Sequence, residues 1–149
     1  MNAVTASSNL VFNLGAEEYA IDIALVRELR GYGRVTRLAG APPCMMGVVN
    51  LRGVIVPLID LRIRLGRPAP SYGETTVVII LAVDGGTTGI VVDGVADVID
   101  LAPEQIKPAP RQGVDGHVLG VAAVDERLLM LLDIGALLRG DARPVALAA

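Results

Sequence analysis

The sequence is poor in the residues that most often carry chemistry. Its 149 residues include one cysteine, one histidine and no tryptophan, and aromatic residues make up 3%. The single cysteine, Cys44, excludes an internal disulfide framework, which suits a reducing compartment. One histidine, His117, with no cysteine nearby provides neither a metal cluster nor a partner for a nucleophile. So few aromatic rings also argue against stacking on bases or sugars. We therefore expect no metal, no cofactor and no catalytic residue, and hence no enzyme.

Long hydrophobic runs and an excess of positive charge are also missing. The longest unbroken apolar run, Val77–Val83, has seven residues, far short of the roughly 20 that span a bilayer. The first nine residues have neither a basic start nor an apolar segment, so no signal peptide is visible. A net charge of −3 argues against nucleic acid as a partner. These features predict a cytoplasmic protein with no direct membrane insertion.

The charge is unevenly distributed along the chain. Residues 10–68 hold eight arginines against five acidic residues, and residues 74–134 hold three basic against ten acidic residues. This asymmetry either favours docking against a partner of matching asymmetry or is a chance imbalance on solvated faces.

Most of the apolar segments have the alternation of β-strands. They are separated by turn residues, as in the pair around Asp84-Gly85-Gly86, which predicts a hairpin. Segment 24–33 instead has leucines and a valine at helical spacing before two glycines, which predicts one or two helical turns. The strand-like segments are residues 10–15, 17–23, 48–61, 75–95 and 121–134.

An internal repeat is the strongest signal in the sequence. A shift of 69 residues aligns the apolar positions of 10–29 with those of 79–98, and it places Glu28 on Asp97. A shift of 73 aligns 47–61 with 120–134 without a gap, so that Gly47 meets Gly120 and Asp60 meets Asp133. Two similar barrels of about five strands each, related by a pseudo-twofold axis, explain this repeat.

The fold class that we predict is all-β with short helices. Residues 10–138 form one domain, with approximately 10–68 in the first barrel and 75–134 in the second, and the two could exchange strands. A barrel of about 60 residues has a marginal core alone, so packing two together supplies burial. Residues 1–9 and 139–149 are expected to be flexible tails, and 111–120 a mobile loop.

Two motifs that could suggest chemistry have simpler explanations. The stretch VDGGTTGI (83–90) is similar to a phosphate-binding hairpin, but Asp-Gly and Gly-Gly are also what a tight turn demands. Asp60 and Asp133 each follow a strand and precede a helix-like segment, where helix N-capping accounts for both.

The two copies differ most at NLRGV (50–54) against AVDER (123–127). Only the first copy carries Asn-Leu-Arg-Gly. In the alignment of the two copies, Arg52 corresponds to Asp125 and Gly53 to Glu126. Arginine is a common anchor at protein interfaces. Pro57 has no amide hydrogen, so we expect its strand at an edge or a bulge. We expect Arg52 at the rim of the barrel, facing a partner.

At these residues the chain resembles the CheW family, the coupling proteins of bacterial chemotaxis. The resemblance covers Leu10 to Leu138 and rests on GVVNLRGVIVPLIDLR, on LVFNLGAEEYAIDIALVRELRGYGRVTRL, on TVVIILAV with GIVVDGVADVIDLAPEQIKPAP, and on LLMLLDIGALL. It implies two intertwined five-stranded SH3-like barrels. It also implies a non-enzymatic adaptor between the cytoplasmic tips of methyl-accepting chemoreceptors and the regulatory domain of a CheA-type histidine kinase, held at membrane-associated arrays through these partners. A CheW-like scaffold for a kinase and receptor system outside motility is the alternative.

The family's receptor-binding groove can be carried over residue by residue. Within that set, Val26 and Val77 could equally be core residues, and Gly47 and Gly53 could simply serve turns. Glu28 and Arg52 are the stronger candidates, because filling a barrel does not need a charged pair. The matching positions are Val26, Glu28, Gly47, Asn50, Leu51, Arg52, Gly53, Val77 and Val98.

Overall fold

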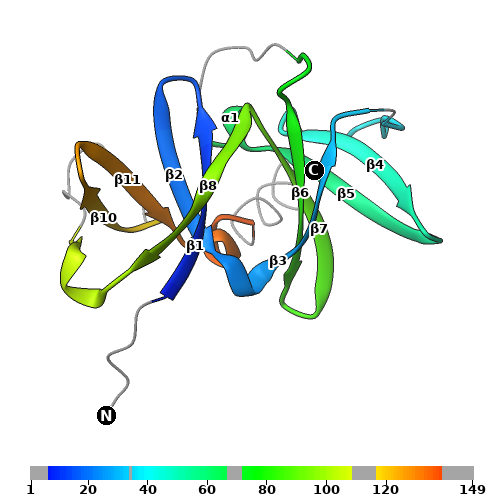
Figure 1. Cartoon of the computed structure of the whole chain (residues 1–149). Helices are drawn as coiled ribbons and strands as arrows, with labels where there is room; N and C mark the ends of the chain where they lie inside the picture. Colours follow the sequence, from blue (N-terminus) through cyan, green and yellow to red (C-terminus); the bar gives the residue numbers. More distant parts are fainter. Residues whose placement is uncertain (1–6, 34, 67–71, 109–116, 139–149) are drawn as a thin grey trace.

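The chain folds into two β-sheets that pack against each other, as the computed structural model shows (Figure 1). The structure describes residues 7–33, 35–66, 72–108 and 117–138. The six-stranded sheet has the order β8-β1-β2-β11-β10-β9, and the five-stranded sheet has the order β3-β6-β7-β5-β4. The elements are β1 (Ser7–Leu14), β2 (Glu17–Asp22), η1 (Ile23–Leu25), β3 (Val26–Gly31), β4 (Met45–Leu51), β5 (Val54–Asp60), α1 (Leu61–Arg64), β6 (Val77–Val83), β7 (Gly86–Val92), β8 (Gly94–Leu101), η2 (Pro103–Gln105), β9 (Ile106–Lys107), β10 (Val118–Val124) and β11 (Arg127–Leu132).

Each sheet combines strands from both halves of the chain. β1 and β2 pair with β8 and β11, whereas β3 and β5 pair with β6 and β7. Both parallel contacts, β11 with β2 and β5 with β7, join strands from different halves. The predicted all-β fold with few short helices is confirmed, although one sheet has six strands. Its extra strand β9 has a counterpart in the five-stranded sheet, the isolated bridge between Thr36 and Val48.

Four strands, β1, β2, β6 and β7, are buried on both faces, which explains the long apolar run of β6. In β6, Ile79 and Leu81 face the core between the sheets, while Val78 and Ile80 face the core of the five-stranded sheet. β1 alternates in the same way, with Phe12 in the central core. Strands covered on both sides are expected to be continuously hydrophobic. Residues that the 69-residue shift aligns thus serve one shared core, including Leu10 with Ile79, Phe12 with Leu81 and Ile21 with Ile90.

Three expectations from the sequence need correction. Segment 24–33 is not helical beyond the 3₁₀ turn η1, because β3 pairs with β6 along its length. Pro57 does not lie on an edge strand, since β5 lies between β7 and β4; pairing with β7 nevertheless begins only at Leu58, so Pro57 faces no ladder partner there. β1 already begins at Ser7, inside the expected tail, and residues 1–6 and 139–149 lie outside the described residues, as does 111–116 of the expected mobile loop.

None of the helices in the described ranges has the length and apolar character that a membrane crossing requires.

Gly47 and its repeat partner Gly120 occupy the same kind of close contact. Each lies where the register shifts in its hairpin, in β4 and β10 respectively. A Cβ on Gly47 would lie against the carbonyl oxygen of Thr36, and Gly47 also has a φ of 144°. A Cβ on Gly120 would lie 2.7 Å from the carbonyl oxygen of Lys107. Both glycines therefore let a neighbouring backbone segment approach.

We predict that Gly47→Ala lowers the free energy of unfolding by more than about 1 kcal/mol, because the methyl group meets backbone at a positive φ. Gly33→Ala is the matched control, since a Cβ there would meet nothing within 4 Å. Equilibrium denaturation of both variants is the measurement. Equal stabilities would show that the close contact at Gly47 does not constrain the fold.

Candidate functional site

The predicted Asn-Leu-Arg-Gly segment is the tight turn between β4 and β5. Arg52 has a φ of 52° and Gly53 a φ of 89°. A non-glycine residue in this left-handed region costs roughly 1–2 kcal/mol. The tight hairpin turn requires it here, as it does at Asp84 and at the repeat partner Asp125, whose φ angles are 53° and 55°. Asn50 accepts a hydrogen bond from the Gly53 amide at 2.8 Å, which holds the turn. The turn therefore presents the Arg52 side chain outward, 71% exposed.

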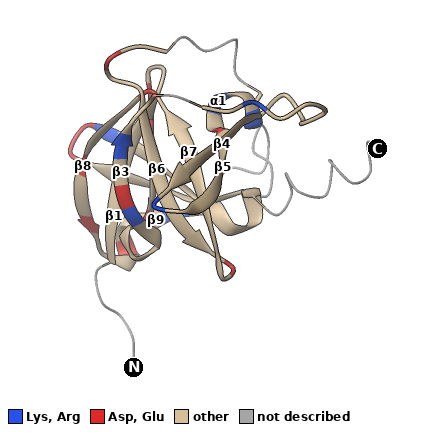
Figure 2. Ribbon diagram, turned by 90° about the vertical axis from the view of Figure 1, so that its right-hand side faces the viewer, with Lys and Arg blue, Asp and Glu red and all other residues tan. Residues whose placement is uncertain are grey.

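Arg52, in the turn after β4, forms an ion pair with Glu28 on β3. The Arg52 Nη2 atom lies 2.8 Å from Glu28 Oε1, and Arg30 Nη1 lies 3.9 Å from Glu28 Oε2. β3 and β4 are the first and last strands of the five-stranded order, so this ion pair brings the two ends of the sheet together. In Figure 2, β3 carries both basic and acidic segments. The sheet is thus closed at this end by charged side chains.

A pocket of about 350 Å³ opens beside this ion pair. Its walls are apolar, formed by Leu51, Val54, Val56 and Ile80, and Glu28 and Arg52 lie among its polar residues, together with Arg27 and Thr87. Val54 and the adjacent Ile55 are 52% and 61% exposed. An apolar floor with a charged rim is the composition of a protein-binding surface. We call this pocket with the Glu28–Arg52 pair the turn site.

The structure brings only some of the predicted site residues to the turn site. Glu28, Asn50, Leu51, Arg52 and Gly53 gather there, although Leu51 is also part of the core of the five-stranded sheet. Val26 lies two residues from Glu28 on β3 and packs against the central core.

The remaining predicted residues lie away from the turn site. Val77 pairs with Gly31 at the opposite end of the β3–β6 ladder, and it packs against the central core. Gly47 lies five residues before Arg52, at the register shift of β4. Val98 is 54% exposed and belongs to β8 of the other sheet.

The six-stranded sheet has an equivalent closure that the sequence reasoning missed. Arg127 forms two hydrogen bonds of 3.1 Å with Asp97 on β8 and two of 2.9 and 3.0 Å with Glu18 on β2. Hydrogen bonds from Arg127 lower the pKa of Asp97, and those to Glu18 and then Asp97 raise the pKa of Arg127. Asp97 is the repeat partner of Glu28. Arg127, however, aligns with Val54 and not with Arg52. The alignment of Glu28 with Asp97 was the signal that could have revealed the pair.

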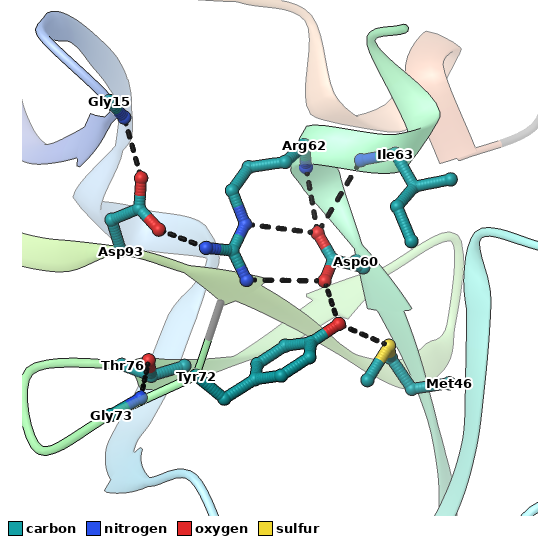
Figure 3. A network of polar contacts seen from close by, with 9 residues as sticks. All are labelled: Gly15, Met46, Asp60, Arg62, Ile63, Tyr72, Gly73, Thr76 and Asp93. Carbon is teal, nitrogen blue, oxygen red and sulfur yellow. Dashed lines mark hydrogen bonds and ion pairs between the residues drawn. The ribbon is translucent and has the colours of Figure 1, made fainter. Parts of the chain in front are cut away.

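A buried polar network joins the two sheets at the end of β5 opposite the turn site (Figure 3). Asp60 is fully buried and accepts hydrogen bonds from the Arg62 and Ile63 amides, which confirms its role as an N-cap. Its carboxylate also pairs with the Arg62 guanidinium, with Nε and Nη2 each at 3.3 Å. Arg62 continues to Asp93, which accepts from the Gly15 amide. The network therefore ties helix α1 to two turns of the neighbouring strands.

Tyr72 covers this network from one side. Its hydroxyl donates to Asp60 at 2.6 Å, and its ring lies 5.1 Å from the Arg62 guanidinium carbon and 4.7 Å from the ring of Tyr32. Burial and then the hydrogen bond to Asp60 raise the pKa of the Tyr72 hydroxyl. Asp60 therefore does more than cap a helix, because it also forms a buried ion pair with Arg62 and accepts a hydrogen bond from Tyr72.

The motifs that the sequence reasoning set aside have ordinary structural roles here. Asp84 and Gly85 have positive φ angles of 53° and 79° in the β6–β7 turn, as a tight hairpin requires. His117 is half-buried, with Nε2 3.4 Å from Arg64 Nη2. Over the described part of the chain, no three His, Cys, Asp or Glu side chains form a group that could hold a metal ion.

A solved scaffolding protein has the same overall fold as this chain. The crystal structure of scaffolding protein TtCheW from Thermoanaerobacter tengcongensis matches with a TM-score of 0.84 and 30% sequence identity, and the match covers 89% of this chain and 92% of that one. The class is therefore a small all-β domain with the fold of that protein.

The chain belongs to the CheW-like domain family, whose model matches residues 8–142. It is 51% identical over 135 residues to the chemotaxis protein CheW of Klebsiella aerogenes, which covers 89% of this chain and 81% of that protein. It is also 34% identical over 137 residues to the chemotaxis protein CheW of Bacillus subtilis, with coverages of 90% and 88%.

We predict that Tyr72→Phe removes a late component from the alkaline titration of the three tyrosines, followed by tyrosinate absorbance. Because the folded-state pKa of Tyr72 is raised, its contribution to stability is full below about pH 10, the unfolded pKa, and is lost as pH rises through the folded pKa. Below that range, the variant should lose about 1 kcal/mol, the typical worth of one hydrogen bond. An unchanged titration curve would contradict the Tyr72–Asp60 contact.

Proposed function

We propose that this protein is a chemotaxis coupling adaptor that links chemoreceptors to a CheA-type histidine kinase without catalysing a reaction. Membership of the CheW-like family and the match to a solved scaffolding protein support this role. The observation that carries its mechanism is the turn site, an exposed arginine paired across the mouth of an apolar pocket.

We assign the turn site to the receptor because five of the nine residues that the resemblance gives to the receptor contact gather there. A receptor's cytoplasmic tip would place an apolar side chain against Leu51, Val54 and Val56, while polar groups of the tip pair with Arg52 or Glu28. A desolvated apolar anchor with a charged rim is where binding energy concentrates at interfaces. Val26 lies beside this contact, and Val98 is an exposed apolar residue on the other sheet that a larger receptor contact would also cover. The regulatory domain of the kinase binds elsewhere on the two sheets, and the adaptor works at arrays through both partners.

Coupling on this proposal needs no chemistry. An adaptor that binds one conformation of the receptor and kinase more tightly than another biases their equilibrium by that difference in affinity. The hydrogen bond from the Gly53 amide to Asn50 and the left-handed backbone of Arg52 hold the turn in one geometry, so little ordering is needed when the receptor binds.

We predict that Arg52→Ala weakens binding of a purified receptor cytoplasmic fragment by about fivefold or more, the loss expected of an interface anchor worth over 1 kcal/mol. The midpoint of thermal unfolding should change little, because an exposed ion pair contributes about 0–1 kcal/mol. Binding of the kinase regulatory domain should be unchanged.

Arg127→Ala is the matched control, because Arg127 closes the other sheet with an equivalent ion pair. Receptor affinity should fall by less than it does for Arg52→Ala, because on this side only Val98, next to Asp97, would adjoin the receptor. Normal receptor binding by the Arg52 variant would exclude the turn site as the receptor contact. Equal losses for both variants would mean that closing the sheets, rather than presenting Arg52, governs binding.

A further inference from the structure

The pseudo-twofold repeat places an open pocket where the other half of the molecule holds its buried ion pair. The pocket has a volume of about 310 Å³ and lies between β1, β2, the end of β11 and the helical turn at 134–138. Its lining includes the carboxylates of Asp22 and Asp133, and the buried amide of Asn9. We call it the Asp133 pocket.

Asp133 is the structural equivalent of Asp60. The amide of Asp133 donates to the carbonyl of His117 at 2.7 Å, and the amide of Asp60 donates to the carbonyl of Cys44 at 2.7 Å. Both pairs are related by the same shift of 73 residues. Each carboxylate also accepts a hydrogen bond from a backbone amide of the helical turn that follows it. For Asp133 the donor is the Ala136 amide.

The two equivalent places differ in what fills them. Beside Asp60 lie the Arg62 guanidinium and the Tyr72 ring, and the Met46 sulfur lies 3.2 Å from the Tyr72 hydroxyl oxygen. At the equivalent positions beside Asp133, Gly135 replaces Arg62 and Leu119 replaces Met46, and both line the pocket. The molecule thus contains a filled and an open version of one site, and the filled version shows that the site accommodates a guanidinium.

We propose that the Asp133 pocket binds an arginine side chain of a partner protein, at a site separate from the turn site. The planar fork of arginine fits a carboxylate with two parallel hydrogen bonds, as Arg62 does with Asp60. The stem of the side chain packs along the apolar walls formed by Leu25, Leu119 and Leu131. Leu119 is 62% exposed at the mouth and offers apolar surface around the entry.

The charge of this half of the molecule favours a cation. Residues 7–25, 93–108 and 117–138, which contain the six-stranded sheet, carry ten acidic side chains against Lys107 and Arg127. Arg127 is already engaged by Glu18 and Asp97. The resulting negative potential would steer a basic segment toward the pocket.

The test is an NMR titration of the full-length protein with a blocked Gly-Arg-Gly peptide and with the same peptide carrying citrulline, which has the shape of arginine without its charge. The arginine peptide should cause saturable shifts of the amides of Asp133, Gly135 and Ala136, and the citrulline peptide should not. Shifts of equal size with citrulline, or none that saturate, would overturn the proposal.

Asp133→Asn should lower the affinity for the arginine peptide about tenfold or more, because hydrogen bonds to charged groups are worth about 1.5–3 kcal/mol. Asparagine caps helices as well as aspartate does, so the fold should be kept. Asp22→Asn provides a second variant if the first is poorly folded, and it too should bind more weakly. Asp125→Asn, a change of the same charge in the β10–β11 turn, should bind as the unaltered protein does. Equal binding by the pocket variants and this control would contradict the proposal.

The chain's own arginines at 139 and 143 are a competing occupant. Arg139→Gln/Arg143→Gln in the full chain should bind the peptide with unchanged affinity. Binding that appears only in this double variant would show that the C-terminal segment fills the pocket, which would overturn docking by a partner.

Discussion

The burial of four strands on both faces is the constraint on which the rest of the structure depends. β1, β2, β6 and β7 each face the core between the sheets on one side and the core of their own sheet on the other. Since β1 and β2 come from one half of the chain and pair with β8 and β11 from the other, neither half has a complete sheet of its own. A core shared in this way supplies the burial that a barrel of about 60 residues lacks alone.

Ion pairs connect the β4–β5 and β10–β11 turns to β3 and β8, the first strand in the order of each sheet. Arg52 with Glu28 and Arg127 with Asp97 are equivalent in role, but the two sites differ in exposure and chemistry. Arg127 is engaged by two carboxylates, whereas Arg52 stands on a strained turn with most of its surface in solvent beside an apolar pocket. An ion pair is present in both copies, and on our proposal the Arg52 copy is the one that contacts a partner. Beside Asp133 the same logic leaves open a pocket that its repeat partner fills internally.

The sequence predicted the elements whose cause is local or repeated. Alternating apolar residues and an Asp-Gly turn predicted the β6–β7 hairpin. The ungapped repeat aligned Gly47 with Gly120, and the structure shows that both allow a close backbone contact. Residues 24–33 were mistaken for helix because β3 is exposed on one side, and the deciding factor, its pairing with β6, is non-local. The buried ion pair at Asp60 could not be predicted for the same reason, as Asp93, Gly15 and Tyr72 approach it from distant parts of the chain. For the site, Arg52 was proposed because the two copies differ there, and its role stays a prediction. Gly47 and Val77 have packing roles in the structure.

Native-state hydrogen exchange across a denaturant series tests most directly whether the two sheets form one cooperative unit. Amides of Val11 in the six-stranded sheet and Ile80 in the five-stranded sheet lie on strands buried on both faces. If exchanged strands and a shared core unite the sheets, both amides should exchange only through global unfolding, with one common free energy. Exchange of one sheet through an opening of distinctly lower free energy, while the other stays protected, would contradict the account.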